Sequence, residues 1–245
     1  MNSRAPELHR YGDHPSQEVE IWRPVSKATH VVALLHGGWW RQRLDRSLMH
    51  ALAGDLAGRG YLVWNIEFRR IDADGAEGGW PATLQDVKTA LRSLTRAYGI
   101  AADQVTAVGH SAGGHLALLA TQECNLAAAV GLAPITDLPS CAEAGLGEGA
   151  TPIFIGGLPH ENPGAYREAS PLLRLPLGHP QLIVHGTKDD RVPVEHSRAY
   201  VESAQDAGDD VDLIEVAGAD HMFVLDPAHP YWRQAITWIG LPRRS

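Results

Sequence analysis

Continuous apolar runs alternate along this chain with segments whose apolar positions recur at helical spacing. The runs Val31–Leu35, Tyr61–Ile66 and Val105–Val108 have the length and the β-branched content of strands that are buried on both faces. Between them, residues 48–56 and 81–94 place apolar side chains along one face, which predicts two amphipathic helices. Strands that alternate with such helices predict a mostly parallel sheet with helices on both faces.

The alternation continues toward the C-terminus, and a short stretch precedes it. Val19–Trp22 alternates apolar and polar positions before a proline, which predicts an edge strand. A polar, glycine-rich loop is predicted at residues 72–79. The later strands are predicted at Ala127–Leu132, Gln181–Gly186 and Val211–Val216, and the later helices at 112–120, 194–207 and Tyr231–Ile239. The expected fold class is therefore α/β, with a doubly wound sheet.

Residues 137–177 interrupt this regular pattern. They are rich in glycine and proline, and their apolar pieces are short. A stretch of this length is usually a functional lid or an excursion over a site, although a surface loop without a role is the alternative. No internal repeat, low-complexity segment or linker is visible, so we expect a single domain over residues 1–245 with a small lid-like insertion.

Charge and cysteine content narrow the classes of partner and compartment. A net charge of −8 over 245 residues gives no reason to expect nucleic acid or an anionic membrane as a partner, since both require clustered Lys and Arg. Cys124 and Cys141 cannot form a disulfide framework and lack metal-ligand spacing, which favours a reducing compartment and no metal site. No apolar signal segment or membrane span is visible, so we expect a cytoplasmic protein with a small-molecule partner, its oligomeric state open.

The first candidate for chemistry is Ser111, which lies between a predicted strand and a predicted helix. Gly109 and Gly113 flank it two residues away on each side, in the G-x-S-x-G pattern of a nucleophile elbow. Only glycine tolerates the close backbone approach of so tight a strand-to-helix turn. A serine hydroxyl held out on such a turn predicts a nucleophile, and an ordinary glycine-rich turn is the alternative.

A second motif, His36–Trp40, follows another buried strand. Glycine pairs at a strand end free backbone N–H groups to point into a cleft, as the donors of an oxyanion hole must. Gly37, Gly38 and Trp39 are therefore candidate oxyanion-hole residues. Two large aromatics after a glycine pair predict a pocket wall, so Trp39 and Trp40 are candidate substrate-binding residues, with a plain loop as the alternative.

A serine nucleophile needs a histidine base, and the base needs a carboxylate to orient it. His221 follows the last predicted strand, where a base can reach the elbow, and Asp189 or Asp190 follows the strand before it. The order Ser, Asp, His along the chain is that of α/β-hydrolases. His110 and His115 are expected to pack or cap, and His36 and His185 to hold loops by hydrogen bonds; the other histidines lack a matching context.

The chain from about residue 30 resembles the α/β-hydrolase superfamily through four motifs taken together. These are His36-Gly37-Gly38, Gly109–Gly114, the run Gly186-x-x-Asp189-x-x-Val192-Pro193, and Asp220-His221. The resemblance implies that Asp189, and not Asp190, is the acid that orients His221. It also implies that the Ala112 N–H joins the oxyanion hole.

Within that superfamily, His36–Trp40 is similar to the H-G-G-x-W signature of kynurenine formamidases, which are related to the hormone-sensitive-lipase esterases. Glu67–Arg70 and Gly79–Ala82 resemble the same formamidase-like group, whereas Trp39 stands where the esterases usually carry a third glycine. The resemblance implies an arylformamidase-type serine hydrolase that acts on substrates like N-formylkynurenine and needs no cofactor. A short-chain carboxylesterase is the nearest alternative, and a catalytically silent binding protein of this fold is a distant one.

Overall fold

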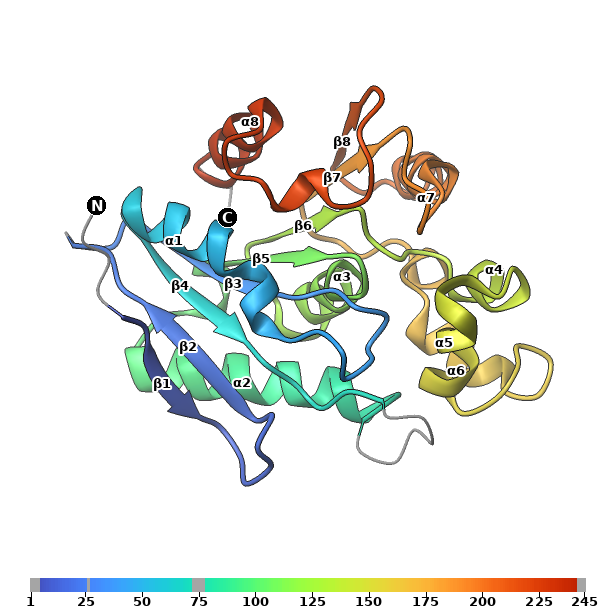
Figure 1. Ribbon diagram of the computed structural model, residues 1–245, viewed down its shortest axis with the longest axis horizontal. Helices are drawn as coiled ribbons and strands as arrows, with labels where there is room; N and C mark the ends of the chain where they lie inside the picture. The colour runs from blue at the N-terminus through green and yellow to red at the C-terminus, as the bar shows by residue number, and fades with distance from the viewer. Residues whose placement is uncertain (1–4, 26, 72–77, 242–245) are drawn as a thin grey trace.

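The computed structural model describes residues 5–25, 27–71 and 78–241, and the strands within these ranges form one eight-stranded sheet (Figure 1). The strand order is β1-β2-β4-β3-β5-β6-β7-β8, in which β1, β2 and β4 pair antiparallel and the remaining pairs are parallel. The strands are β1 (Glu7–Arg10), β2 (Glu18–Trp22), β3 (His30–Leu35), β4 (Tyr61–Ile66), β5 (Val105–His110), β6 (Ala128–Leu132), β7 (Gln181–Gly186) and β8 (Val211–Val216).

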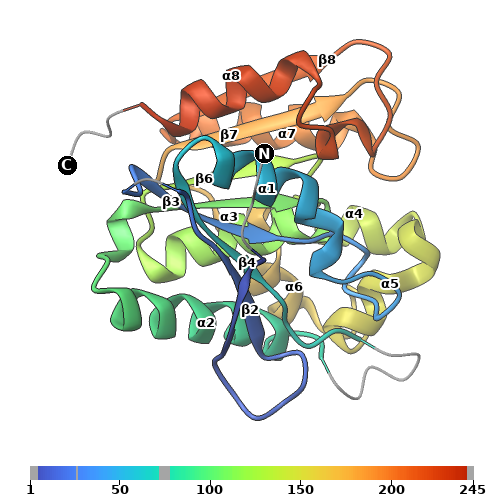
Figure 2. The same ribbon diagram turned by 60° about the vertical axis from the view of Figure 1, so that its left-hand side comes forward.

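Helices cover both faces of the sheet, as Figure 2 shows most clearly. The helices α1 (His50–Gly58) and α8 (Pro230–Ile239) pack on one face, against side chains such as Val32 and Leu34 of β3. The other face carries α2 (Ala82–Tyr98), α3 (Ala112–Cys124) and α7 (Val194–Asp206). Each central strand is thus buried on both sides, which explains its continuous apolar sequence. The predicted doubly wound, mostly parallel α/β sheet is confirmed.

Some local features differ from the predictions. β1 was not predicted, because Glu7–Arg10 carries a single apolar side chain and pairs only at the sheet edge. The helix expected to include Pro81 in its first turn begins one residue later, at Ala82. Within the glycine-rich loop predicted at 72–79, residues 72–77 lie outside the described part of the chain.

The irregular region 137–177 is an insertion between β6 and β7, as predicted, but much of it is helical. Its elements are α4 (Leu138–Glu143), α5 (Leu146–Ile155), α6 (Pro163–Ala169) and the 3₁₀ helix η3 (Pro171–Arg174). α4, α6 and η3 are too short to show a helical period in the sequence, and the left-handed residues 147–149 and Pro152 interrupt α5, so packing stabilises these helices more than local propensity does. Phe154 and Tyr166 of the insertion are buried in the same core cluster as α2 and α3. The other 3₁₀ helices are η1 (Arg46–Met49), η2 (Ala102–Gln104) and η4 (Phe223–Leu225).

The register of the parallel strands brings their carboxyl ends to one edge of the sheet. Leu35 of β3 lies opposite Gly109 of β5, and Gly186 of β7 lies opposite Val216 of β8. The loops after these strands therefore meet at the edge where doubly wound sheets place their sites. Among the described residues, no helix is long and apolar enough to cross a bilayer.

Candidate active site

Ser111 sits at a sharp turn between β5 and α3. Its backbone has φ 54° and ψ −117°, in a region that a residue with a side chain adopts only under strain. The turn is held by three backbone hydrogen bonds: the Ser111 N–H donates to Leu132 O at 2.8 Å, and the Ser111 carbonyl accepts from His115 N and Ile135 N. Several independent contacts thus fix the direction of the serine, as a nucleophile elbow requires.

The flanking glycines are needed for the reason that the sequence suggests. A Cβ placed on Gly109 would lie 2.0 Å from the carbonyl oxygen of Gly113, and one on Gly113 would lie 2.1 Å from that of Leu35. Both contacts are with backbone atoms, which cannot rotate away as a side chain can. The elbow therefore packs α3 directly against β5 and β3, and only glycine permits that packing.

The loop after β3 lies against the elbow, and two of its residues are in a strained conformation. A Cβ on Gly37 would come within 3.1 Å of the Ser111 Cβ, so the loop backbone passes beside the serine. Gly38, Trp39 and Trp40 all have positive φ, at 115°, 54° and 56°. For the two tryptophans this conformation costs about 1 kcal/mol or more each. Within the described chain, neither the Gly38 N–H nor the Trp39 N–H donates a hydrogen bond, so both remain available to an incoming group.

His36 and Glu67 orient this loop. The His36 Nδ1–H donates to the Gly37 carbonyl at 2.8 Å, and His36 Nε2 lies 2.9 Å from Glu67 Oε1. Because a trans peptide is planar, holding the Gly37 oxygen on one side directs the Gly38 N–H to the other. Burial would raise the pKa of Glu67, but His36 and the Arg46 N–H outweigh burial and hold that pKa below its usual value. The ionised Glu67 thus keeps His36, and through it Gly37, in one orientation.

His221 and Asp189 are joined by a short hydrogen bond. The His221 Nδ1–H donates to Asp189 Oδ2 at 2.6 Å, which leaves Nε2 as the ring nitrogen free to act on a proton. The other oxygen of Asp189 accepts from the backbone N–H groups of Arg191 and Val192, both at 2.9 Å. The side chain of Asp190 is exposed and makes no hydrogen bond or ion pair within the described residues. The structure therefore brings Asp189, not its neighbour, to the histidine.

A second histidine, His185, also lies close to Asp189. His185 Nε2 lies 3.0 Å from Asp189 Oδ2 and 2.9 Å from the Val192 carbonyl, and His185 Nδ1 lies 2.7 Å from Ser197 Oγ. Burial would raise the pKa of Asp189, but the hydrogen bonds from His185 and His221 outweigh burial and hold that pKa well below its usual range. The carboxylate therefore stays ionised at neutral pH, as a group that must stabilise a charged imidazole should.

His110 places the His221 loop beside the elbow. The rings of His110 and His221 lie with their centroids 4.7 Å apart, and His110 Nε2–H donates to the His221 carbonyl at 3.3 Å. Burial, assisted by the charge of His221, lowers the pKa of His110 to about 3, so His110 is neutral near pH 7. Because His110 directly precedes Ser111, its contact with His221 brings His221 and Ser111 to the same edge of the sheet. The side chains of both are almost enclosed, with Ser111 2% and His221 3% exposed.

The two tryptophans take different places in the structure. Trp40 is 1% exposed and stacks on Phe154 at 4.2 Å between ring centroids, with the edge of His115 against it. Trp39 is 5% exposed, and Gly147 of α5 lies directly against its ring. Trp40 thus packs against α3 and the insertion, and Trp39 packs against the insertion; contact of either with a substrate stays a prediction.

His115 is buried behind the elbow, as expected of a packing residue. Its Nε2–H donates to the Ala169 carbonyl at 2.7 Å. Burial lowers the pKa of His115 from the ordinary histidine value of 6.5 to about 4. The unfolded chain therefore takes up a proton at this position between pH 6.5 and about 4, while the folded chain does not. The stability contributed by neutral His115 is complete above pH 6.5 and is lost as the pH falls through this window.

We expect His115→Gln to make the protein less sensitive to mild acid. When the pH is lowered from 7 to 5, the unfolding free energy of the variant should fall by about 2 kcal/mol less than that of the wild type. Urea denaturation at both pH values measures this difference. His160→Gln, which changes an exposed histidine, should leave the pH dependence of the wild type unchanged. An equal loss of unfolding free energy between pH 7 and 5 in the wild type and in His115→Gln would contradict the conclusion that buried His115 is neutral.

Two polar groups of this edge were assigned no part in the site from the sequence. The sequence shows Glu67 only as part of a motif. It predicts that His185 holds a loop, which His185 does through the Val192 carbonyl, but it does not predict the approach of His185 to Asp189. The available signal was position, since each lies at the carboxyl end of a buried strand. Within residues 5–25, 27–71 and 78–241, no three His, Cys, Asp or Glu side chains are grouped as metal ligands would be.

Comparisons with known proteins agree with this geometry. The sequence profile of the BD-FAE family matches residues 19–203. The esterases LipC and LipQ of Mycobacterium tuberculosis are 27% and 28% identical to this chain over 88% and 84% of its length. The chain covers 59% and 54% of these relatives, little more than half of each. A truncated carbohydrate esterase from gut microbiota superposes with a TM-score of 0.81 at 21% identity, covering 98% of this chain and 95% of that one.

Proposed function

We propose that this chain, which belongs to the BD-FAE family, is a serine hydrolase of the carboxylesterase type. In this proposal Ser111 is the nucleophile, His221 is the base, and Asp189 is the acid that orients His221. The observation that carries the proposal is the 2.6 Å hydrogen bond from His221 to Asp189, on a loop that contacts the strained elbow of Ser111. The esterase relatives support it, because they match this chain over most of its length.

In the proposed reaction, Ser111 Oγ attacks the acyl carbonyl carbon while His221 Nε2 takes the hydroxyl proton. The oxyanion that forms accepts hydrogen bonds from the Ala112 N–H at the start of α3 and from the free N–H groups of the Gly37–Trp39 loop. His221 then gives its proton to the leaving alcohol or amine, and the C–O or C–N bond breaks. Water attacks the acyl-serine with His221 again as base, which releases the acid and restores Ser111.

The proposed acyl group is small. Supporting this, Ser111 and His221 are almost enclosed, and the side chains of Trp39 and Trp40 pack against the insertion. Two substrate classes fit a small acyl group. The sequence similarity of His36–Trp40 to formamidases favours a formyl amide of an aromatic amine, such as N-formylkynurenine, whereas the esterase relatives favour a short-chain carboxylic ester.

We expect the purified protein to react with a fluorophosphonate probe at Ser111 and to hydrolyse acetyl esters faster than butyryl esters. Comparing kcat/KM for p-nitrophenyl acetate, p-nitrophenyl butyrate and N-formylkynurenine, with formate release measured for the last, decides between the two substrate classes. A kcat/KM for N-formylkynurenine above that for the acetyl ester would assign an arylformamidase, and the reverse would assign an esterase. Absence of both labelling and turnover would leave a binding protein of this fold.

A further inference from the structure

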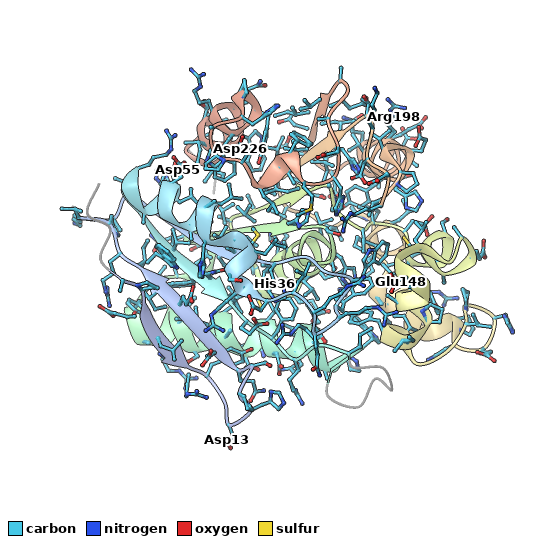
Figure 3. All side chains as sticks on the ribbon, viewed as in Figure 1. Asp13, His36, Asp55, Glu148, Arg198 and Asp226 are labelled. Atoms are coloured by element: carbon cyan, nitrogen blue, oxygen red, sulfur yellow. The ribbon has the colours of Figure 1, made fainter. Side chains whose placement is uncertain are left out.

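The oxyanion loop touches the insertion at one unusual turn. At the start of α5, Gly147, Glu148 and Gly149 all adopt the left-handed conformation, with φ of 61°, 59° and 69°. A Cβ on Gly147 would lie 2.2 Å from Cδ2 of Trp39, so the glycine backbone rests on the face of that indole. Figure 3 shows Glu148 at this turn, on the side of the insertion that the loop after β3 approaches.

Arg41 of the same loop also binds this turn. Arg41 Nη2 donates to the Glu148 carbonyl at 3.0 Å and lies 3.5 Å from the Gly147 carbonyl. The Arg43 guanidinium lies 3.4 Å from the Glu148 carboxylate, in an exposed pair that adds little. The left-handed turn thus presents its carbonyl groups to Arg41 and its bare Gly147 backbone to Trp39.

Trp39 and Trp40 need such support because their backbone is strained. Residues with side chains keep a positive φ only where the surrounding structure imposes it. Inside the loop, the Arg41 N–H donates to the Gly38 carbonyl, and the Ile71 N–H of the segment after β4 donates to the Trp40 carbonyl at 2.7 Å. From outside the loop, Phe154 of α5 stacks on Trp40, and Gly147 of the same element covers Trp39.

We propose that Gly147 is a positioning residue for the oxyanion hole: its bare backbone seats the Trp39 indole, and this seat holds the strained Gly38-Trp39 backbone with its N–H groups in place for the oxyanion. The inference rests on the proposed function, since it assigns these N–H groups to the transition state. It extends that function to the insertion, which then stabilises the conformation of the oxyanion loop as well as covering the site. A side chain at position 147 pushes the indole, and the loop backbone moves with it.

The glycines of this turn provide a matched comparison. Gly147→Ala and Gly149→Ala introduce the same methyl group at the same left-handed φ, but around Gly149 a Cβ would meet no atom within 4 Å. Both variants should lose thermal stability because of the left-handed φ, and Gly147→Ala should lose more because its methyl group also meets the Trp39 ring, so kinetics are compared at a temperature at which both are folded. Only Gly147→Ala should lose activity, with kcat for p-nitrophenyl acetate lower by about 10- to 100-fold and KM within about twofold, because donors to the oxyanion act mainly in the transition state.

Two further measurements separate positioning from general damage. An aryl trifluoromethyl ketone forms a hemiketal oxyanion on the serine, so its affinity should fall in Gly147→Ala by about the same factor as kcat. Trp39→Leu removes the ring that the new methyl group meets, so Gly147→Ala should cost much less kcat in the Trp39→Leu background than in the wild type. Arg41→Met loosens the turn without adding volume, and it should also lower kcat at constant KM even if Gly147→Ala fails to fold.

Equal kcat values for Gly147→Ala and Gly149→Ala would overturn the inference, as would wild-type kcat in Arg41→Met where Gly147→Ala does not fold. Loss of kcat without loss of ketone affinity would also overturn it. These results differ from a failure of the proposed function, in which the wild-type protein itself shows neither turnover nor fluorophosphonate labelling.

Discussion

Replacing Ser111 by alanine is expected to lower kcat for ester hydrolysis by roughly 10⁴-fold or more. The residue forms the acyl bond in the proposed reaction, and no neighbouring hydroxyl lies on the elbow to replace it. Alanine keeps the backbone hydrogen bonds of the turn to Leu132 and His115, so the fold should be retained. Steady-state kinetics with p-nitrophenyl acetate measures the loss, and circular dichroism with thermal melting checks the fold.

Fluorophosphonate labelling gives this prediction its sharpest control. The wild-type protein should take up one probe at Ser111, and the alanine variant should take up none while it melts within a few degrees of the wild type. Turnover close to that of the wild type in a folded Ser111→Ala protein would remove Ser111 from the proposed mechanism.

The second large effect is expected for Asp189→Asn, with kcat lower by about 10³- to 10⁴-fold. The substitution keeps the shape of the side chain but removes the negative charge that stabilises protonated His221. An amide NH₂ turned toward His221 would also favour the wrong tautomer of the ring. The hydrogen bonds from the Arg191 and Val192 N–H groups can still be accepted by the amide oxygen, so the loop should remain folded.

Asp190→Asn is the matched control, since it makes the same change on the adjacent residue. Asp190 is exposed, and His221 donates to Asp189, so kcat should stay within about twofold of the wild type. Steady-state kinetics on the two variants side by side tests the assignment. A large loss in Asp190→Asn with little change in Asp189→Asn would reverse it.

Much of the fold could be predicted from the sequence because the central strands are buried on both faces. Tyr61–Ile66 is apolar except for Asn65, and Gln181–Gly186 has an apolar centre at Leu182–Val184; the structure places strands at the bounds predicted for both. β1 could not be predicted, since an exposed edge strand needs no apolar pattern. The helices of the insertion escaped prediction for different reasons: α4 and α6 are too short to repeat a helical period, and the left-handed residues 147–149 and Pro152 interrupt α5.

The candidate site was likewise only partly predictable from the sequence. Ser111 and its two glycines could be identified from spacing alone, because a tight elbow imposes glycine at fixed positions around the nucleophile. The partners of Trp39 could not be identified so, because Gly147 lies more than one hundred residues away and nothing in its local sequence refers to an indole. The approach of His185 to Asp189 likewise depends on how the loop after β7 turns back.

The sequence by itself determined the doubly wound sheet, the elbow at Ser111, the glycine loop after β3 and the candidate acid and base, because each follows from local periodicity, local sterics or residue order. Only the tertiary structure decided which neighbouring groups orient them: Glu67 behind His36, His185 beside Asp189, and Gly147 under Trp39. The physical reason is that these contacts join segments far apart in the chain, and their geometry is set by packing at the carboxyl edge of the sheet and not by any local preference.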